Sequence, residues 1–370
     1  MRIVMFYQSL ISDWNHGNAH FLRGVAAELL SRRYTVDIYE PANSWSVENL
    51  LREHGGDPVR KFAAAFPQLS STRYDLKTLD LDRVLDNADL VLVHEWNEPE
   101  LIEKIGKYAR LTRSFKLLFH DTHHRLVSED RLDFSLDDYD GVLAYGAVIA
   151  DMYLRRSWTN RAWTWHEAAD VRVFRPLPEI ERVDNLVWIG NWGDDERTNE
   201  LRQFLLTPAK TLRLGGRVYG VRYPREAINE IEQAGLKYCG WLPNHRVPKA
   251  FARARLTLHI PRAPYVQALP GIPTIRVFEA LACGIPLICS PWADNEGLFR
   301  SGKDFLLAHN GDEMQTLLLD VLNDPVLAEE LAISGLATIL ERHTCAHRVD
   351  ELLGIYRELT SIGERQMAIA

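Results

Sequence analysis

Short apolar runs alternate along the chain with segments of helical periodicity. After the first run and a polar loop, Phe21, Leu22, Val25, Ala26, Leu29 and Leu30 recur at helical spacing. Short apolar runs separated by helices are typical of parallel strands that helices cover on both faces. In the first half of the chain this pattern predicts strands at Arg2–Phe6, Thr35–Tyr39, Asp89–Val93, Lys116–His120, Gly141–Ala144 and Ala162–Trp165.

A break follows at residues 174–179, where Pro176 and Pro178 interrupt any continuing element. The alternation then resumes. It predicts strands at Leu186–Gly190, Thr211–Leu214, Leu236–Cys239, Leu256–Ile260, Pro286–Cys289 and Asp304–Ala308. We therefore predict an α/β chain with two Rossmann-like, doubly wound domains that face a central cleft.

The expected domains are residues 1–174 and 185–349, joined by a linker at 175–184. Residues 350–370 are predicted to form a C-terminal helix that packs back towards the N-terminal domain. Residues 44–85 are less regular, and the pattern assigns no elements to them. A length of 370 residues agrees with two domains, each large enough to bury a core.

Charge and cysteine content narrow the class of protein. The 43 basic and 51 acidic side chains give a net charge of −8, which argues against a general nucleic-acid coat or an anionic-membrane binder. The four cysteines include no CxxC pair, so neither a disulfide framework nor a zinc site is expected. No stretch approaches the ~20 apolar residues of a membrane span. The N-terminal run is too short for a signal peptide, and we predict a cytoplasmic protein.

Residues 268–290 carry the most informative chemistry. A Gly/Pro-rich loop enters a helix at about Thr274, the helix ends at Gly284, and a buried strand follows. Free N–H groups at such a helix start suit a phosphate, and Arg276 would add a charge-assisted partner. Glu279, one turn later, could accept two hydrogen bonds from a diol such as ribose. The alternative is an ordinary capping carboxylate beside a surface arginine.

Ile275–Gly284 resembles the donor-site helix of the GT-B glycosyltransferases. It is most similar to the spore-maturation-protein-like enzymes, which are related to retaining family 4 (glycosyl transferases group 1). The resemblance extends, in order, over most of residues 185–355. It includes the segments Trp188–Arg197, Gly240–Pro243, Leu256–Arg262, Asp294–Leu307 and Glu341–Leu353.

The resemblance implies that the second domain binds a nucleoside diphosphate sugar, with UDP favoured and GDP possible, and that no permanent cofactor or metal is needed. Glu279 would hold the ribose, and Arg197 and Arg276 the diphosphate. The other donor-binding residues that it implies are Gly271, Ile272, Thr274 and Ile275 in the loop, Gly240, Trp241 and Leu242 at the base, and Asn191. Family 4 enzymes usually carry a second glutamate where this chain has Gly271, so the identity of the sugar stays open.

Acceptor-side candidates lie at the ends of predicted strands of the first domain, where ligands of such folds bind. They are Asn15, His16 and Gly17 after the first strand, His94, Glu95 and Trp96, then His120 and Asp121, and finally His166 and Glu167 near the domain junction. Three histidines, His120, His123 and His124, with Asp121 also suggest a metal site. A polar contact to the acceptor is the preferred interpretation, because no HExxH pattern is present.

We predict a glycosyltransferase of hexosyltransferase type that moves a sugar from the nucleotide donor to a small-molecule, glycan or protein acceptor. Retention of configuration is preferred. An inverting enzyme would need a base, with His16, Asp121 and His120 as the candidate catalytic residues. The alternatives are a nucleotide-sugar 2-epimerase of GT-B fold and a non-catalytic nucleotide-sugar-binding partner subunit.

Overall fold

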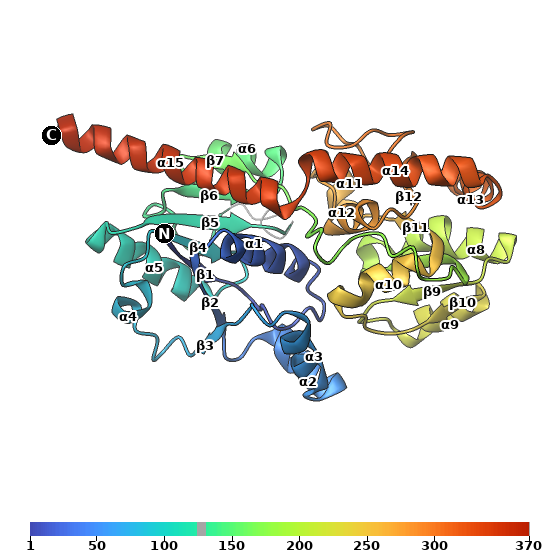
Figure 1. Cartoon of the computed structure of the whole chain (residues 1–370), viewed down its shortest axis with the longest axis horizontal. Helices are drawn as coiled ribbons and strands as arrows, with labels where there is room; N and C mark the ends of the chain where they lie inside the picture. The colour runs from blue at the N-terminus through green and yellow to red at the C-terminus, as the bar shows by residue number, and fades with distance from the viewer. Residues whose placement is uncertain (124–130, 370) are drawn as a thin grey trace. The chain divides into compact units, whose positions relative to one another are not determined.

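The computed structural model describes residues 1–123 and 131–369. The chain divides into two compact units, each built on one parallel sheet (Figure 1). Unit 1 comprises Met1–His166 and Cys345–Ala370, and unit 2 comprises Glu167–Thr344. The sequence pattern placed the two divisions at 174/175 and 349/350, whereas the structure has them after His166 and after Thr344.

The sheet of unit 1 has the order β3-β2-β1-β4-β5-β6-β7, and every pairing is parallel. Its strands are β1 (Arg2–Phe6), β2 (Thr35–Pro41), β3 (Thr72–Tyr74), β4 (Leu90–His94), β5 (Lys116–Asp121), β6 (Gly141–Ala144) and β7 (Ala162–Thr164). The predicted strands are confirmed, with small shifts at their ends. β3, a mostly exposed edge strand, was missed because only one of its three residues is buried.

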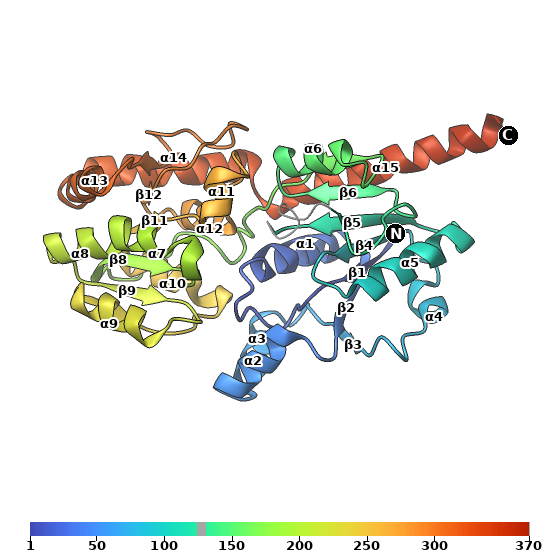
Figure 2. The same cartoon turned by 180° about the vertical axis from the view of Figure 1, so that it is seen from behind.

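The described helices of unit 1 are α1 (Ala19–Ser31), α2 (Trp45–His54), α3 (Asp57–Ala65), α4 (Leu81–Leu85), α5 (Pro99–Thr112), α6 (Ala147–Arg155) and α15 (Cys345–Ile369). Residues 44–85, unassigned from sequence, form α2, α3, β3 and α4. The long helix α15 lies alongside α1 in both views (Figures 1 and 2). At its first turns, Trp165 Nε1 donates to the Arg348 carbonyl over 2.8 Å.

The sheet of unit 2 is also parallel, with the order β10-β9-β8-β11-β12-β13. Its strands are β8 (Asp184–Ile189), β9 (Gly216–Tyr219), β10 (Leu236–Tyr238), β11 (Ala254–His259), β12 (Leu287–Cys289) and β13 (Leu306–Leu307). Side chains alternate between two cores: Leu186 and Trp188 face one, and Val187 and Ile189 face the other. This alternation is what a sheet covered on both faces requires.

The helical segments of unit 2 are η2 (Asp194–Glu196), α7 (Thr198–Leu201), the π-helical η3 (Arg202–Leu206), α8 (Thr207–Leu212), α9 (Arg225–Gln233), η4 (Asn244–Arg246), α10 (Val247–Ala252), α11 (Ala263–Gln267), α12 (Ile275–Ala282), α13 (Gly311–Asn323) and α14 (Pro325–Arg342). The strand predicted at Thr211–Leu214 is wrong. These residues end the helical run that starts at Thr198, and Arg213 terminates it in the left-handed conformation at φ 52°. A run this short has too little periodicity to separate helix from strand.

Helix α12 is held rigidly against the sheet. It begins after Thr274, whose backbone is extended, and ends before Gly284, whose φ of 62° favours glycine. On its buried side α14 approaches closely at Gly335, where an added Cβ would lie 2.6 Å from Leu281 Cδ2. The last turn of α12 is therefore packed closely against α14. None of the described helices is both long and apolar enough to cross a bilayer.

Candidate functional site

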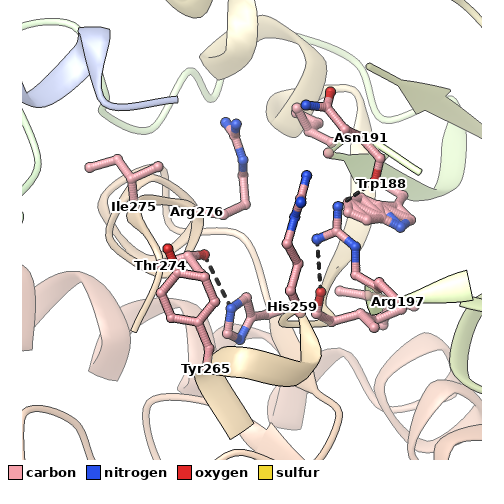
Figure 3. Close-up of a pocket in the computed structure, with 13 residues that line it drawn as sticks. Trp188, Asn191, Arg197, His259, Tyr265, Thr274, Ile275 and Arg276 are labelled. Carbon is pink, nitrogen blue, oxygen red and sulfur yellow. Dashed lines mark hydrogen bonds between the residues drawn. The ribbon is translucent and has the colours of Figure 1, made fainter. Parts of the chain in front are cut away.

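In unit 2 the strand order reverses at β8, which has β9 on one side and β11 on the other. The loops that leave such a pair of strands diverge, and ligands of doubly wound sheets bind at the carboxyl ends beside them. A pocket of about 170 Å³ lies at this place. It is lined by Trp188, Ile189, Gly190 and Asn191 at the end of β8, Leu258, His259 and Ile260 at the end of β11, Thr274, Ile275 and Arg276 at the start of α12, and Arg197, Arg262 and Tyr265 (Figure 3).

Arginines supply positive charge to the pocket, although two of them pair with carboxylates outside the lining: Arg262 with Glu196 over 2.8 Å and Arg276 with Glu279. Three of its thirteen lining residues are arginines, and none of the thirteen is an aspartate or a glutamate. His259, hydrogen-bonded to Thr274 over 3.2 Å, adds no charge at neutral pH. Burial, together with Arg197 and Arg276, lowers the pKa of His259 to about 3. The positive charge therefore comes from guanidinium groups and from the α12 N-terminus, an arrangement that suits a phosphate-bearing anion.

Arg197 is fixed before any ligand binds. It donates from Nη1 to the Ile260 carbonyl over 3.0 Å and from Nη2 to the Asn191 carbonyl, and it lies 5.0 Å from the Trp188 ring (Figure 3). Burial lowers the pKa of Arg197 to about 10, so it stays charged at neutral pH. Its Nε is buried and has no hydrogen-bond partner among the described residues. An anion in the pocket would supply the acceptor that this N–H lacks.

Glu279 does not line the pocket. Its side chain is fully buried, and Arg276 Nη1 donates to its carboxylate. Asn244 Nδ2 lies 3.4 Å from the other carboxylate oxygen. The carboxylate that sequence resemblance assigns to the ribose therefore faces Arg276 in this structure.

The structure thus gathers five of the predicted donor-binding residues around one pocket: Asn191, Arg197, Thr274, Ile275 and Arg276. Gly240, Trp241 and Leu242 follow β10 and are half-buried outside the pocket lining. Ile272 is buried, and Gly271, at φ 97°, donates its N–H to the Ala293 carbonyl over 2.8 Å. Sequence reasoning missed His259, Arg262 and Tyr265 as site residues. The signal was available, since His259 lies at the end of the strand predicted at Leu256–Ile260 and the other two follow that strand.

In unit 1 the strand order reverses in the same way, between β1 and β4. At this switch point the side-chain rings of tyrosine and histidine residues pack together. Tyr7 and His94 lie 5.6 Å apart between ring centroids, and His94 and His120 lie 5.4 Å apart. His94 Nε2 is 2.9 Å from the Thr122 hydroxyl, and the Thr122 N–H donates to Glu95 over 2.9 Å. Strand-end residues predicted from separate segments therefore come together in one buried cluster.

His120 lies in the core of unit 1. Its ring centroid is 4.8 Å from that of Trp165, and burial alone lowers the pKa of His120 to about 3. Neither ring nitrogen has a hydrogen-bond partner among the described residues. Asp121 accepts hydrogen bonds from the Tyr153 hydroxyl at 2.9 Å and from the His123 N–H at 3.1 Å.

The metal site considered from sequence included His124, which lies outside the described residues. Within residues 1–123 and 131–369, no group of three or more His, Cys, Asp or Glu side chains could hold a metal ion.

The loop after β1 is fixed by a buried ion pair. Arg23 Nη1 lies 2.8 Å from Asp13, and Arg23 also donates to the Leu10 and Ile11 carbonyls. His16 in this loop is buried, and burial with the Arg23 charge lowers the pKa of His16 to about 4. The Ser9 carbonyl accepts a hydrogen bond from the His16 ring. Because Nε2 has no partner among the described residues, Nδ1 makes this bond and Nε2 carries a lone pair.

His166 and Glu167, the candidates near the domain junction, are buried. Three other acceptor-side candidates are more accessible. Asn15 and Gly17 flank His16 and are half-buried, and the Asn15 backbone is left-handed at φ 49°. Trp96 is 37% exposed, and its ring centroid lies 5.1 Å from that of His123.

The comparisons with known proteins agree with this architecture. Residues 197–354 match the family described as "Glycosyl transferase-like". Sucrose-phosphate synthase from Thermosynechococcus elongatus is similar over 98% of this chain and 100% of its own, with a TM-score of 0.67 and 14% identity. The chain has the GT-B glycosyltransferase fold. This confirms the predicted fold class and the resemblance to group 1 glycosyltransferases.

Other solved GT-B structures are similar to the same extent. HepE of Anabaena, solved with UDP and glucose, has a TM-score of 0.66 and 13% identity over 97% of this chain and 100% of its own. An alpha-glucosyltransferase, solved with UDP and a 13-mer DNA, has a TM-score of 0.66 and 10% identity over 96% of this chain and 99% of its own. At such low identity these structures establish the fold alone. No curated protein sequence matches the chain.

Proposed function

We propose that the protein is a glycosyltransferase that takes a hexosyl group from a UDP-sugar, with the diphosphate bound in the pocket of unit 2. The observation that carries this proposal is the set of three arginines, Arg197, Arg262 and Arg276, around a pocket with no acidic lining side chain. A pocket at the switch point of a doubly wound sheet, beside a helix N-terminus, is suited to a nucleoside diphosphate.

The same groups support metal-independent transfer. When the bond between the anomeric carbon and the phosphate oxygen breaks, negative charge develops on the leaving UDP. Donors that are already oriented stabilise such charge without reorganisation. Arg197, held by two backbone carbonyls and by Trp188, is oriented in this way before the donor binds. Three guanidinium groups would take the part that a divalent cation plays elsewhere.

UDP is the favoured nucleotide. HepE was solved with UDP-glucose, and BGT of T4 phage with its UDP-glucose substrate. The acceptor, whether a small molecule, a glycan or a protein, would be met by strand-end residues of unit 1: Asn15, His16 and Gly17, and His94, Glu95 and Trp96.

We propose retention of the anomeric configuration, as the family 4 resemblance implies. The carboxylates at the unit 1 switch point support this choice, because Glu95 and Asp121 already accept hydrogen bonds from buried groups. If the product is inverted instead, His16 is the group able to act as base, since its Nε2 lone pair is uncommitted among the described residues. The anomeric signal of the product in NMR distinguishes the two outcomes.

The test is incubation with a panel of nucleotide sugars, measuring release of free nucleoside diphosphate. We expect hydrolysis or transfer with a UDP-hexose, and thermal stabilisation by UDP. Arg276→Gln should weaken UDP binding by about tenfold or more, because it removes one charge-assisted contact. Arg202→Gln is the matched control, since Arg202 pairs with Glu230 on the surface of unit 2 and does not line the pocket. Equal effects of the two substitutions, or no response to any nucleotide, would contradict the proposal.

A further inference from the structure

A second pocket lies in unit 2, at the end of the sheet opposite the arginine-lined pocket. Its volume is about 410 Å³. Three segments border it, and each leads into a strand: residues 176–182 into β8, residues 251–254 into β11 and residues 283–285 into β12. The second pocket is therefore at the amino ends of these parallel strands. A volume of this size falls within the range of about 300–1,000 Å³ that is typical of small-molecule sites.

The side chains that line the second pocket are mostly apolar, and they include Pro176, Leu177, Pro178, Ile180, Phe251 and Ile285. The two prolines stiffen the segment 176–182, because each fixes its backbone φ. The segment is also held on both sides. The Val183 N–H donates to the Arg253 carbonyl over 2.9 Å, and Pro176 packs against Gly284, where an added Cβ would lie 3.3 Å from Pro176 Cγ. A wall held in this way keeps the pocket open.

Arg182 is the charged residue among the described residues that line the second pocket. Its side chain is exposed, and it makes no hydrogen bond or ion pair with the described parts of the chain. Glu179 and Glu181 belong to the same segment but do not line the pocket. One guanidinium beside apolar walls matches a ligand with an apolar body and a single negative charge. A carboxylate carries that charge and accepts two parallel hydrogen bonds from an arginine.

We propose that the second pocket is a binding site for a small aliphatic carboxylate, separate from the donor site. The aliphatic body would lie between the proline-containing segment and the side chains of Phe251 and Ile285, where it loses contact with water. The carboxylate would pair with Arg182 at the solvent-exposed side. This inference does not rest on the proposed function, because the two pockets have no lining residue in common.

The test is calorimetric titration of the full chain with decanoate below its micellar concentration. Decanol is the neutral ligand of equal chain length, and acetate is the anion without a chain. We expect decanoate to bind about fivefold more tightly than decanol, the contribution of one exposed ion pair, and acetate to show no measurable binding. Arg182→Gln should weaken decanoate binding by about fivefold and leave decanol binding unchanged, because decanol offers no negative group.

Arg225→Gln is the matched control, because Arg225 is an exposed arginine of α9 that does not line the second pocket. It should bind decanoate and decanol as the wild type does. The proposal is wrong if the wild type does not bind decanoate, if R182Q loses affinity equally for decanoate and decanol, or if R225Q loses as much as R182Q.

A second measurement locates the ligand without any substitution. In methyl NMR spectra, decanoate should change the chemical shifts of Ile180 and Ile285, which line the second pocket, and not those of Ile260 and Ile275, which line the arginine-lined pocket. Changes confined to Ile260 and Ile275 would mean that decanoate binds the arginines there, and would overturn the inference. A protein that binds decanoate in the second pocket but binds no nucleotide would contradict only the proposed function.

Discussion

The two sheets reverse their strand order around the first strand, β1 in unit 1 and β8 in unit 2, but their switch points are filled differently. In unit 2 the carboxyl ends of β8 and β11 border a pocket that is lined by arginines. In unit 1 the corresponding ends carry Tyr7, His94 and His120, whose rings pack against one another and against Trp165. Topology thus decides where a ligand can bind, and the side chains decide what chemistry is available there.

Two buried arginines show the difference most directly. Arg23 in unit 1 and Arg197 in unit 2 both donate to two backbone carbonyls. Arg23 is neutralised by Asp13 at 2.8 Å, while Arg197 has a buried Nε without a partner among the described residues. The first arginine therefore ties a loop together, and the second has a donor left for a ligand.

The largest expected effect separates these two arginines. Arg197→Gln should reduce UDP-sugar turnover by about 10²–10³-fold, the cost of removing one oriented charge stabiliser. Arg23→Gln should instead reduce the free energy of unfolding by about 3–5 kcal/mol, because it removes the guanidinium from a buried ion pair with Asp13. Urea unfolding and initial rates of UDP release measure the two effects. The comparison fails if Arg23→Gln lowers turnover per folded molecule as much as Arg197→Gln.

The second effect concerns acid stability. Burial lowers the pKa of His120 to about 3, whereas in the unfolded chain it titrates at its ordinary value. Its contribution to stability is complete above the unfolded pKa and is lost as pH falls towards the folded one. By about pH 4 the loss should reach about 3 kcal/mol. His120→Leu should flatten this acid slope in urea unfolding, and an unchanged slope would show that His120 is not buried as a neutral ring.

The sequence could predict those parts of the fold and of the site that depend on residues close together in the chain. The strand at Gly141–Ala144 is a local apolar run, and the sequence pattern predicted its bounds correctly. Thr274 and Arg276 were predicted to lie together in the donor site because both belong to the same helix start. The Arg276–Glu279 pair is an i,i+3 contact within α12, which helical spacing could have predicted. The approach of Glu167 to Ile275 depends instead on packing between distant segments. No periodicity in a single sequence reports such contacts.

The third effect is smaller and contrasts two neutral histidines. The pKa of His120 is lowered by burial alone, but that of His259 is also lowered by Arg197 and Arg276. UDP would offset the arginine charges, so its binding should raise the pKa of His259 and leave that of His120 unchanged. We expect UDP affinity to rise, relative to His259→Gln, as pH falls towards the raised pKa of His259 in the UDP-bound protein. If the UDP affinities of the wild type and of His259→Gln depend on pH in the same way, the arginines of the pocket do not affect the pKa of His259 as proposed.

The smallest effect tests whether position at the switch point matters for an exposed ion pair. Arg262 and Glu196 in unit 2 are 2.8 Å apart with side chains 27% and 39% exposed, and Arg2 and Asp37 in unit 1 are 2.8 Å apart at 22% and 39%. Pairs this accessible contribute less than about 1 kcal/mol to stability, so either arginine can be replaced by glutamine without unfolding the chain.

Arg262 lines the pocket, whereas Arg2 stands at the opposite, amino end of its sheet. Arg262→Gln should therefore weaken UDP binding by about threefold at low salt, and the difference should shrink as ionic strength screens the partly exposed charge. Arg2→Gln should leave UDP affinity unchanged at every salt concentration. Titrations in a salt series distinguish the two. A salt-dependent loss of affinity in both variants would mean that net charge, and not the place of the arginine at the end of β11, attracts the nucleotide.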